Sequence, residues 1–96
     1  MPFEHRVAVT VEHPGSTTVT FEVQGRDISR TGMRVQHGNY VYPGSPTTVS
    51  FLRGKGVLFA VPGRVVRCEY VGSKQHDVGI AFENPMGSRE LSLLNP

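Results

Sequence analysis

Two segments near the start of the chain alternate between large apolar residues and small or polar ones. Residues 6–11 read Arg-Val-Ala-Val-Thr-Val, and residues 18–23 read Thr-Val-Thr-Phe-Glu-Val. Because successive side chains of a β-strand point to opposite faces, this period of two places the valines and the phenylalanine on one face of each strand. The sequence His-Pro-Gly-Ser at 13–16 supplies turn-forming residues between the two segments. The chain therefore begins with a predicted β-hairpin.

The rest of the chain continues this pattern of short strands and tight turns. Strand candidates lie at residues 33–35, 47–52, 57–70 and 78–82, and a glycine turn at 53–56 predicts a second hairpin. Pro62-Gly63 interrupts the long candidate, which predicts an edge position or a bulge and a bend in the strand. Residues 88–94 can form one or two helical turns, with Ser88 as the cap and Pro96 just beyond the end.

The number of strands and the length of the chain together predict an all-β fold. Fourteen Val and seven Thr stand against three Ala, and 96 residues suffice for one domain, residues 1–96. Strands without intervening helices indicate an antiparallel barrel or sandwich, and closure into a barrel removes the sheet edges that so short a chain cannot cover. The expected core consists of Val9, Val19, Phe21, Val35, Val49, Phe51, Val65, Ile80 and Phe82.

Most kinds of site chemistry find no support in the sequence. The four histidines, His5, His13, His37 and His76, lack metal-ligand spacing, and no serine stands in a glycine-flanked elbow. We therefore expect that the protein binds no metal or cofactor and is not an enzyme. A lone Cys68 and the absence of an apolar leader or membrane-spanning run predict a cytoplasmic protein without membrane insertion. No strand face carries interleaved aromatic residues, so we expect no nucleic-acid partner.

Arginine is the unusual feature of the charge composition. Eight of the ten basic residues are Arg, although the net charge is only +2. The planar guanidinium matches phosphate oxygens and the O6/N7 edge of guanine. Half of the arginines lie in or beside two short segments: Arg6, Arg26, Arg30 and Arg34. Three of these four lie within or just after a polar stretch at 26–32, whereas the remaining four arginines have no ligand role that the sequence supports.

The polar stretch carries a recognisable motif. Residues 27–32, Asp-Ile-Ser-Arg-Thr-Gly, match the Asp/Asn-x-Ser-x-x-Gly motif of PilZ domains, the bacterial receptors for cyclic di-GMP. Gly-Arg-Val-Val-Arg at 63–67 and Val-Gly-Ile-Ala-Phe at 78–82 are similar to further blocks of these domains, so the resemblance covers nearly the whole chain. It implies a six-stranded antiparallel PilZ-like β-barrel with a short C-terminal helix.

The resemblance is incomplete in the second motif of the family, Arg-x-x-x-Arg. Arg6 resembles the second arginine, but Pro2 stands where the first is expected, and a proline side chain offers no donor. By the resemblance, these arginines grip the phosphates and guanine edges of the ligand, and the Asp and Ser of the other motif bind guanine. The ligand-binding residues it implies are Arg6, Asp27, Ser29 and Gly32, with Arg26, Arg30 and Arg34 as weaker candidates.

Two functions follow from these residues. The first is a receptor or adaptor that binds cyclic di-GMP, with affinity weakened by the missing arginine, and that signals to a protein partner. The alternative is a degenerate PilZ module that binds no nucleotide and acts by protein contact in motility or pilus assembly. Pro2 favours the alternative, as do Tyr40 and Tyr42, which lie in a long connection where they could anchor a partner.

Overall fold

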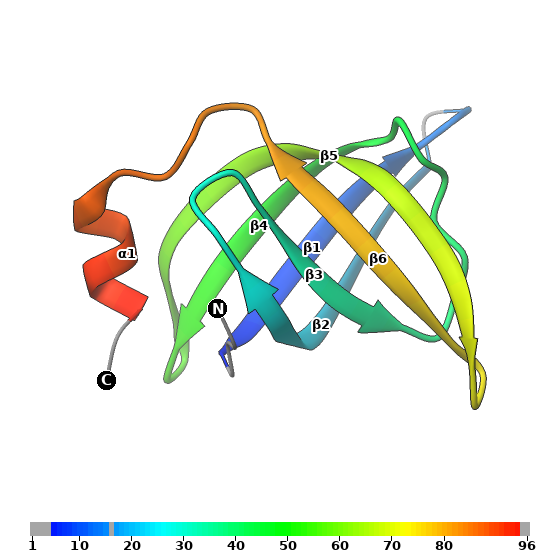
Figure 1. Cartoon of the computed structure of the whole chain (residues 1–96), viewed down its shortest axis with the longest axis horizontal. Helices are drawn as coiled ribbons and strands as arrows, with labels where there is room; N and C mark the ends of the chain where they lie inside the picture. The colour runs from blue at the N-terminus through cyan, green and yellow to red at the C-terminus, as the bar shows by residue number, and fades with distance from the viewer. Residues whose placement is uncertain (1–4, 16, 95–96) are drawn as a thin grey trace.

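The computed structural model describes residues 5–15 and 17–94, and it contains six antiparallel strands that close into a barrel, followed by one short helix (Figure 1). The strands are β1 (Arg6–His13), β2 (Thr17–Ile28), β3 (Gly32–His37), β4 (Pro46–Arg53), β5 (Gly56–Gly72) and β6 (Gln75–Phe82). Around the ring their order is β1-β2-β3-β6-β5-β4. The predicted all-β barrel and both predicted hairpins are confirmed.

The inward-facing residues of the strands form the core of the barrel. Seven of the nine predicted core residues are buried, but Val19 and Phe21 are only half-buried. The prediction is wrong there because this half of β2 pairs with β1 alone, and β3 joins β2 only from Gly25 onward. The core also contains buried residues that the prediction omitted: Val7, Val11, Ile28, Met33, Val41, Val78 and Met86.

Strand β5 runs through Pro62-Gly63 without interruption. Pro62 keeps its register with Thr48 on β4. The register shifts lie elsewhere: between Phe51 and Leu52, between Val65 and Arg67, and between Tyr70 and Gly72. The predicted bulge at this dipeptide is therefore wrong, whereas the predicted edge position is confirmed on one side, because β6 pairs with β5 only from Gly63 onward. The amide of Glu83 donates to the carbonyl of Pro62 at 3.0 Å. Because the nitrogen and oxygen of a strand residue point to the same side, the proline nitrogen faces the side on which β6 has just ended, where no ladder bond is lost.

Helix α1 (Ser88–Leu94) confirms the predicted C-terminal helix and lies against one end of the barrel (Figure 1). Leu91 and Leu94 pack on the core, and Met86, just before the helix, is almost completely buried. Within the described residues, no helix has the length and apolar character needed to cross a membrane. The segment between β6 and α1 thus closes the barrel end at which β2 turns into β3.

Candidate functional site

The turn between β2 and β3 is fixed by hydrogen bonds on two sides. The loop is shorter than predicted, because β2 continues to Ile28 and leaves only residues 29–31 outside the strands. The amide of Ser29 donates to the carbonyl of Gly32 at 2.9 Å, and the Ser29 hydroxyl accepts from the amide of Thr31 at 3.3 Å. These bonds hold the Ser29 side chain at the surface of a closed turn.

The same turn is tied to the segment between β6 and α1. The amide of Met86 donates to the carbonyl of Arg30 at 2.7 Å, and Arg30 Nε returns a bond to the carbonyl of Met86 at 3.1 Å. The amide of Phe82 donates to the carbonyl of Thr31 at 2.8 Å. Arg30, a weaker ligand candidate, therefore has a structural role: its guanidinium holds the turn to the barrel end.

Gly32 is required by close packing of two strands. A Cβ atom at this position would overlap the carbonyl oxygen of Ile80 on β6, well inside the separation that real Cβ atoms keep. The φ angle of Gly32 is not positive, so backbone conformation does not impose the glycine. The last residue of the motif thus lets β3 and β6 approach each other directly beside the turn.

A bulge in β2 sets the direction of Asp27. Gly25 pairs with Val35 and Asp27 pairs with Arg34, so Arg26 is an extra residue between the two pairs. Arg26 points along the sheet, where its Nη2 donates to Gln36 Oε1 at 3.4 Å. Bulges re-aim the side chains beside them. Here the bulge places Asp27 opposite Arg34.

The motif residues line one surface depression. It has a volume of about 330 Å³ and is lined by Asp27, Ile28, Ser29, Gly32, Met33 and Arg34. This volume lies at the lower end of the range of small-molecule sites. The structure therefore brings together three predicted ligand-binding residues, Asp27, Ser29 and Gly32. Arg34, a weaker candidate, lines the same depression.

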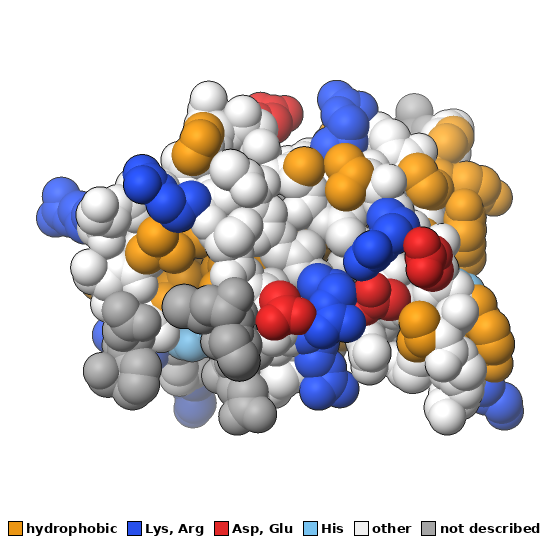
Figure 2. All heavy atoms as spheres, viewed as in Figure 1, with side chains coloured by type: hydrophobic (Ala, Val, Ile, Leu, Met, Phe, Trp, Pro, Cys, Tyr) orange, Lys and Arg blue, Asp and Glu red, His pale blue; other side chains and the backbone are white. Residues whose placement is uncertain are grey.

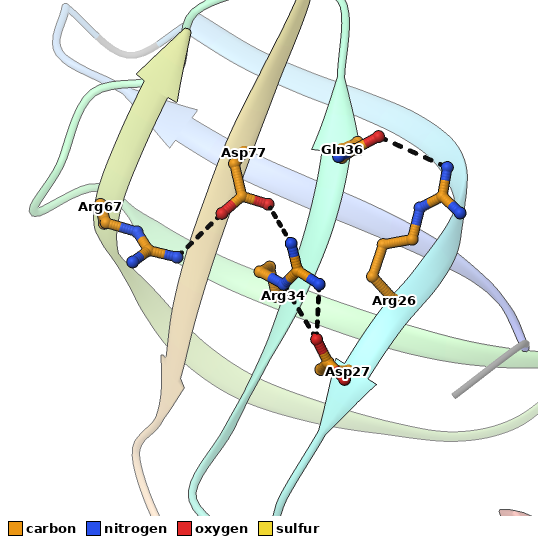
Figure 3. Close-up of polar contacts among 6 residues, drawn as sticks. All are labelled: Arg26, Asp27, Arg34, Gln36, Arg67 and Asp77. Carbon is orange, nitrogen blue, oxygen red and sulfur yellow. Dashed lines mark hydrogen bonds and ion pairs between the residues drawn. The ribbon is translucent and has the colours of Figure 1, made fainter. Parts of the chain in front are cut away.

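Arg34 joins two carboxylates, those of Asp27 and Asp77, and with Arg67 these side chains form a row of ion pairs across β2, β3, β6 and β5 (Figure 3). Arg34 Nε and Nη2 contact Asp27 Oδ2 at 3.0 and 2.6 Å, and Arg34 Nη1 contacts Asp77 Oδ1 at 3.1 Å. Arg67 Nη2 contacts the other oxygen of Asp77 at 2.9 Å. The hydrogen bond to Asp27 and then that to Asp77 raise the pKa of Arg34 above its ordinary value, so this side chain stays charged.

The four ion-paired side chains lie on one face of the barrel. In the space-filling view, basic and acidic side chains alternate over β3 and β6 (Figure 2). The side chain of Asp77 is only 10% exposed, whereas those of Asp27 and Arg34 are 47% and 39% exposed. The sequence pointed to neither Asp77 nor Arg67. The available signal was that Asp77 stands one residue before the alternating segment 78–82, in phase with its outward positions.

Arg6 lies on β1 and does not contact the motif. Its Nε forms an ion pair with Glu22 Oε1 at 2.8 Å, and its Nη2 donates to the carbonyl of Gly54 at 3.0 Å. Glu22 lies on β2 and Gly54 lies in the turn between β4 and β5, so neither partner belongs to residues 27–32. Pro2, the other position of the arginine motif, lies outside the described residues.

The family model of the PilZ domain matches residues 3–95. The chain belongs to the PilZ domain family. A search of the curated proteins found no match. In this PilZ domain the Asp-x-Ser-x-x-Gly motif forms the last residues of β2, the turn, and the first residue of β3. The family thus accounts for the motif and the barrel together.

A cluster of tyrosine and histidine rings lies at the end of this PilZ barrel that is opposite to the β2–β3 turn. Tyr40 and Tyr42 are 49% and 54% exposed, and their ring centroids are 5.3 Å apart in an edge-to-face arrangement. Tyr42 also contacts His13, and Tyr40 contacts His76. A groove of about 660 Å³ passes beside Tyr42 and His13. The expected aromatic pair is therefore exposed and far from the motif.

Proposed function

We propose that this PilZ domain is a receptor for cyclic di-GMP that binds the ligand at the depression beside the β2–β3 turn. The observation that carries the proposal is the gathering of Asp27, Ser29 and Gly32 at one depression, on a turn held in place from both sides. The Asp27 carboxylate and the Ser29 hydroxyl are suited to the N–H groups and polar edge of a guanine base. The domain has no catalytic step in this proposal, and a partner protein reads the bound state.

Arg6 is the proposed contact for a ligand phosphate. Its ion pair with Glu22 is about half exposed on both sides, and such surface pairs contribute about 0–1 kcal/mol, so Arg6 can exchange Glu22 for a phosphate oxygen at little cost. Pro2 supplies no second donor. One missing bond to a charged partner corresponds to about 1.5–3 kcal/mol, which is about a tenfold to hundredfold loss of affinity.

Calorimetric titration with cyclic di-GMP tests this function. We expect the parent to bind, Arg6→Ala to bind about tenfold to a hundredfold more weakly, and Ser29→Ala about two- to tenfold more weakly. Lys74→Gln is the control, because Lys74 lies in the turn between β5 and β6 at the other end of the barrel and the change removes the same charge as Arg6→Ala. The proposal is wrong if the parent gives no heat at high micromolar ligand or if both site variants bind as tightly as the parent.

The second candidate function is a PilZ module that acts through a protein partner without nucleotide. It is favoured by the contacts of Arg6, which lead away from the motif, and by the exposed pair Tyr40 and Tyr42 at the far end of the barrel. Exposed tyrosines are frequent anchors of protein interfaces. A pull-down whose captured partner is lost in Tyr42→Ala, and is unchanged by added cyclic di-GMP, supports this function. Capture that requires the nucleotide contradicts it.

A further inference from the structure

Arg34 holds two carboxylates that differ strongly in their surroundings. Asp27, at the edge of the depression, has a side chain that is 47% exposed, and Asp77 has a side chain that is only 10% exposed. Arg34 uses Nε and Nη2 for Asp27 and Nη1 for Asp77, so the two sides of its guanidinium serve different partners (Figure 3). One side of the fork faces the candidate site, and the other faces a buried anchor.

The two ion pairs of Arg34 also differ in how readily they open. An exposed pair such as Asp27–Arg34 is screened by water and contributes little to stability. Opening the pair with Asp77 would instead take a partner away from a nearly buried carboxylate, which is strongly unfavourable. Arg67 holds the second oxygen of Asp77 from β5 at 2.9 Å. Asp77 therefore stays in place while the contact at Asp27 can change.

Gly79 on β6 lies between the two arginines that hold Asp77. It pairs with Arg34 on one side and with Arg67 on the other. A Cβ atom at Gly79 would lie 3.5 Å from the Cβ of Arg67, which is an ordinary van der Waals contact. The two arginines therefore flank one position of β6, and Asp77 lies two residues away from it on the same outward face.

We propose that Arg34 is itself a ligand contact, and that ligand binding replaces Asp27 by a ligand phosphate oxygen on the outer side of the guanidinium while Asp77 retains the inner side. This inference rests on the proposed function. The exchange preserves the charge around Arg34, because one anionic oxygen takes the place of another. It also frees the Asp27 carboxylate to accept hydrogen bonds from the N1–H and 2-amino groups of guanine. Asp77 and Arg67 act as positioning residues.

The direct test follows the side-chain Nε–H signal of Arg34 by ¹H–¹⁵N NMR during titration of the full chain with cyclic di-GMP. Arg34→Gln and Arg67→Gln assign the two signals by their disappearance. We expect the Arg34 signal to move in proportion to ligand occupancy and the Arg67 signal to stay within the small shifts seen across the barrel. A structural ion pair without ligand contact would leave both signals unchanged.

Affinities of matched variants provide the second readout. We expect Arg34→Gln to weaken binding about tenfold to a hundredfold. Arg34→Lys should restore little of it, because an ammonium lacks the fork needed to hold Asp77 and a ligand oxygen together. Asp77→Asn should weaken binding less than Arg34→Gln, and Lys74→Gln should leave it unchanged. Thermal unfolding of each variant shows whether a loss of affinity reflects a loss of folded protein.

The outcomes separate the two proposals. No binding by the parent overturns the proposed function and this inference with it. Binding by the parent, with an unmoved Arg34 signal or with undiminished affinity in a folded Arg34→Gln, overturns the inference alone. Movement of the Arg34 signal together with weakened binding by Arg34→Gln supports both.

Discussion

Replacing Gly32 by Ala tests whether this motif glycine serves strand packing. The new Cβ would overlap the carbonyl oxygen of Ile80, and an ordinary contact begins near 3.4 Å. The strands β3 and β6 must then separate locally by about 1 Å, and overpacking of this kind costs about 1–3 kcal/mol. The shift also strains the bonds from Ser29 to Gly32 and from Phe82 to Thr31, each worth about 0.5–1.5 kcal/mol. We expect a total loss of about 2–4 kcal/mol in the free energy of unfolding.

Urea denaturation followed by circular dichroism measures this loss. The control is Gly56→Ala, because the nearest atom to a Cβ at Gly56 is 4.0 Å away and its φ angle is not positive. The control should change the free energy of unfolding by no more than about 0.5 kcal/mol in the destabilising direction. If Gly32→Ala is as stable as Gly56→Ala, the packing argument is refuted. If it is equally stable but no longer binds ligand, the glycine serves the ligand directly.

Further predictions concern the two ends of the barrel. Met86→Ala should lower the free energy of unfolding by about 2–5 kcal/mol, because Met86 is 1% exposed between the barrel end and the β2–β3 turn; an equally stable variant in urea denaturation would contradict this packing. Burial, and then the nearby His76, lower the pKa of His37 below 6.5. The unfolded chain therefore binds a proton at this residue more readily, and stability should decrease as the pH falls from about 6.5 through the lower folded pKa. His37→Phe keeps the stack on Phe21 and should flatten this part of the profile; an unchanged slope would show that other groups cause it.

The strands and the turn motif could be predicted because their signals are local. A period of two along residues 6–11 and 18–23 is sufficient to fix the inward face, and the register of β1 and β2 agrees with it, Val9 lying opposite Phe21. The depth of burial was less predictable. Phe21 faces inward, but its exposure depends on where β3 begins to pair with β2, and no local pattern encodes that position.

The anchor of Arg34 could not be predicted for a similar reason. Asp77 is 43 residues away along the chain, and it reaches Arg34 only because β3 pairs with β6 in the observed register. The carboxylate partner of Arg6 is easier to predict from the sequence, because Glu22 lies near Arg6 across the first hairpin. The uninterrupted course of β5 through Pro62 could not be predicted, because a proline is tolerated inside a long strand wherever the neighbouring strand has ended, and that point depends on the length of β6.

Strand β3 carries core residues on one face and site residues on the other within six positions. Met33 and Val35 are buried, whereas Arg34 and Gln36 stand on the outer wall. Groups on opposite faces of one sheet share few contacts, so their substitutions should combine additively. Consequently substitutions at Arg34 and Gln36 should alter the contacts of the outer wall without a compensating change at Met33 or Val35. A receptor and a plain interaction module could therefore share this barrel and differ only at outward residues of its strands.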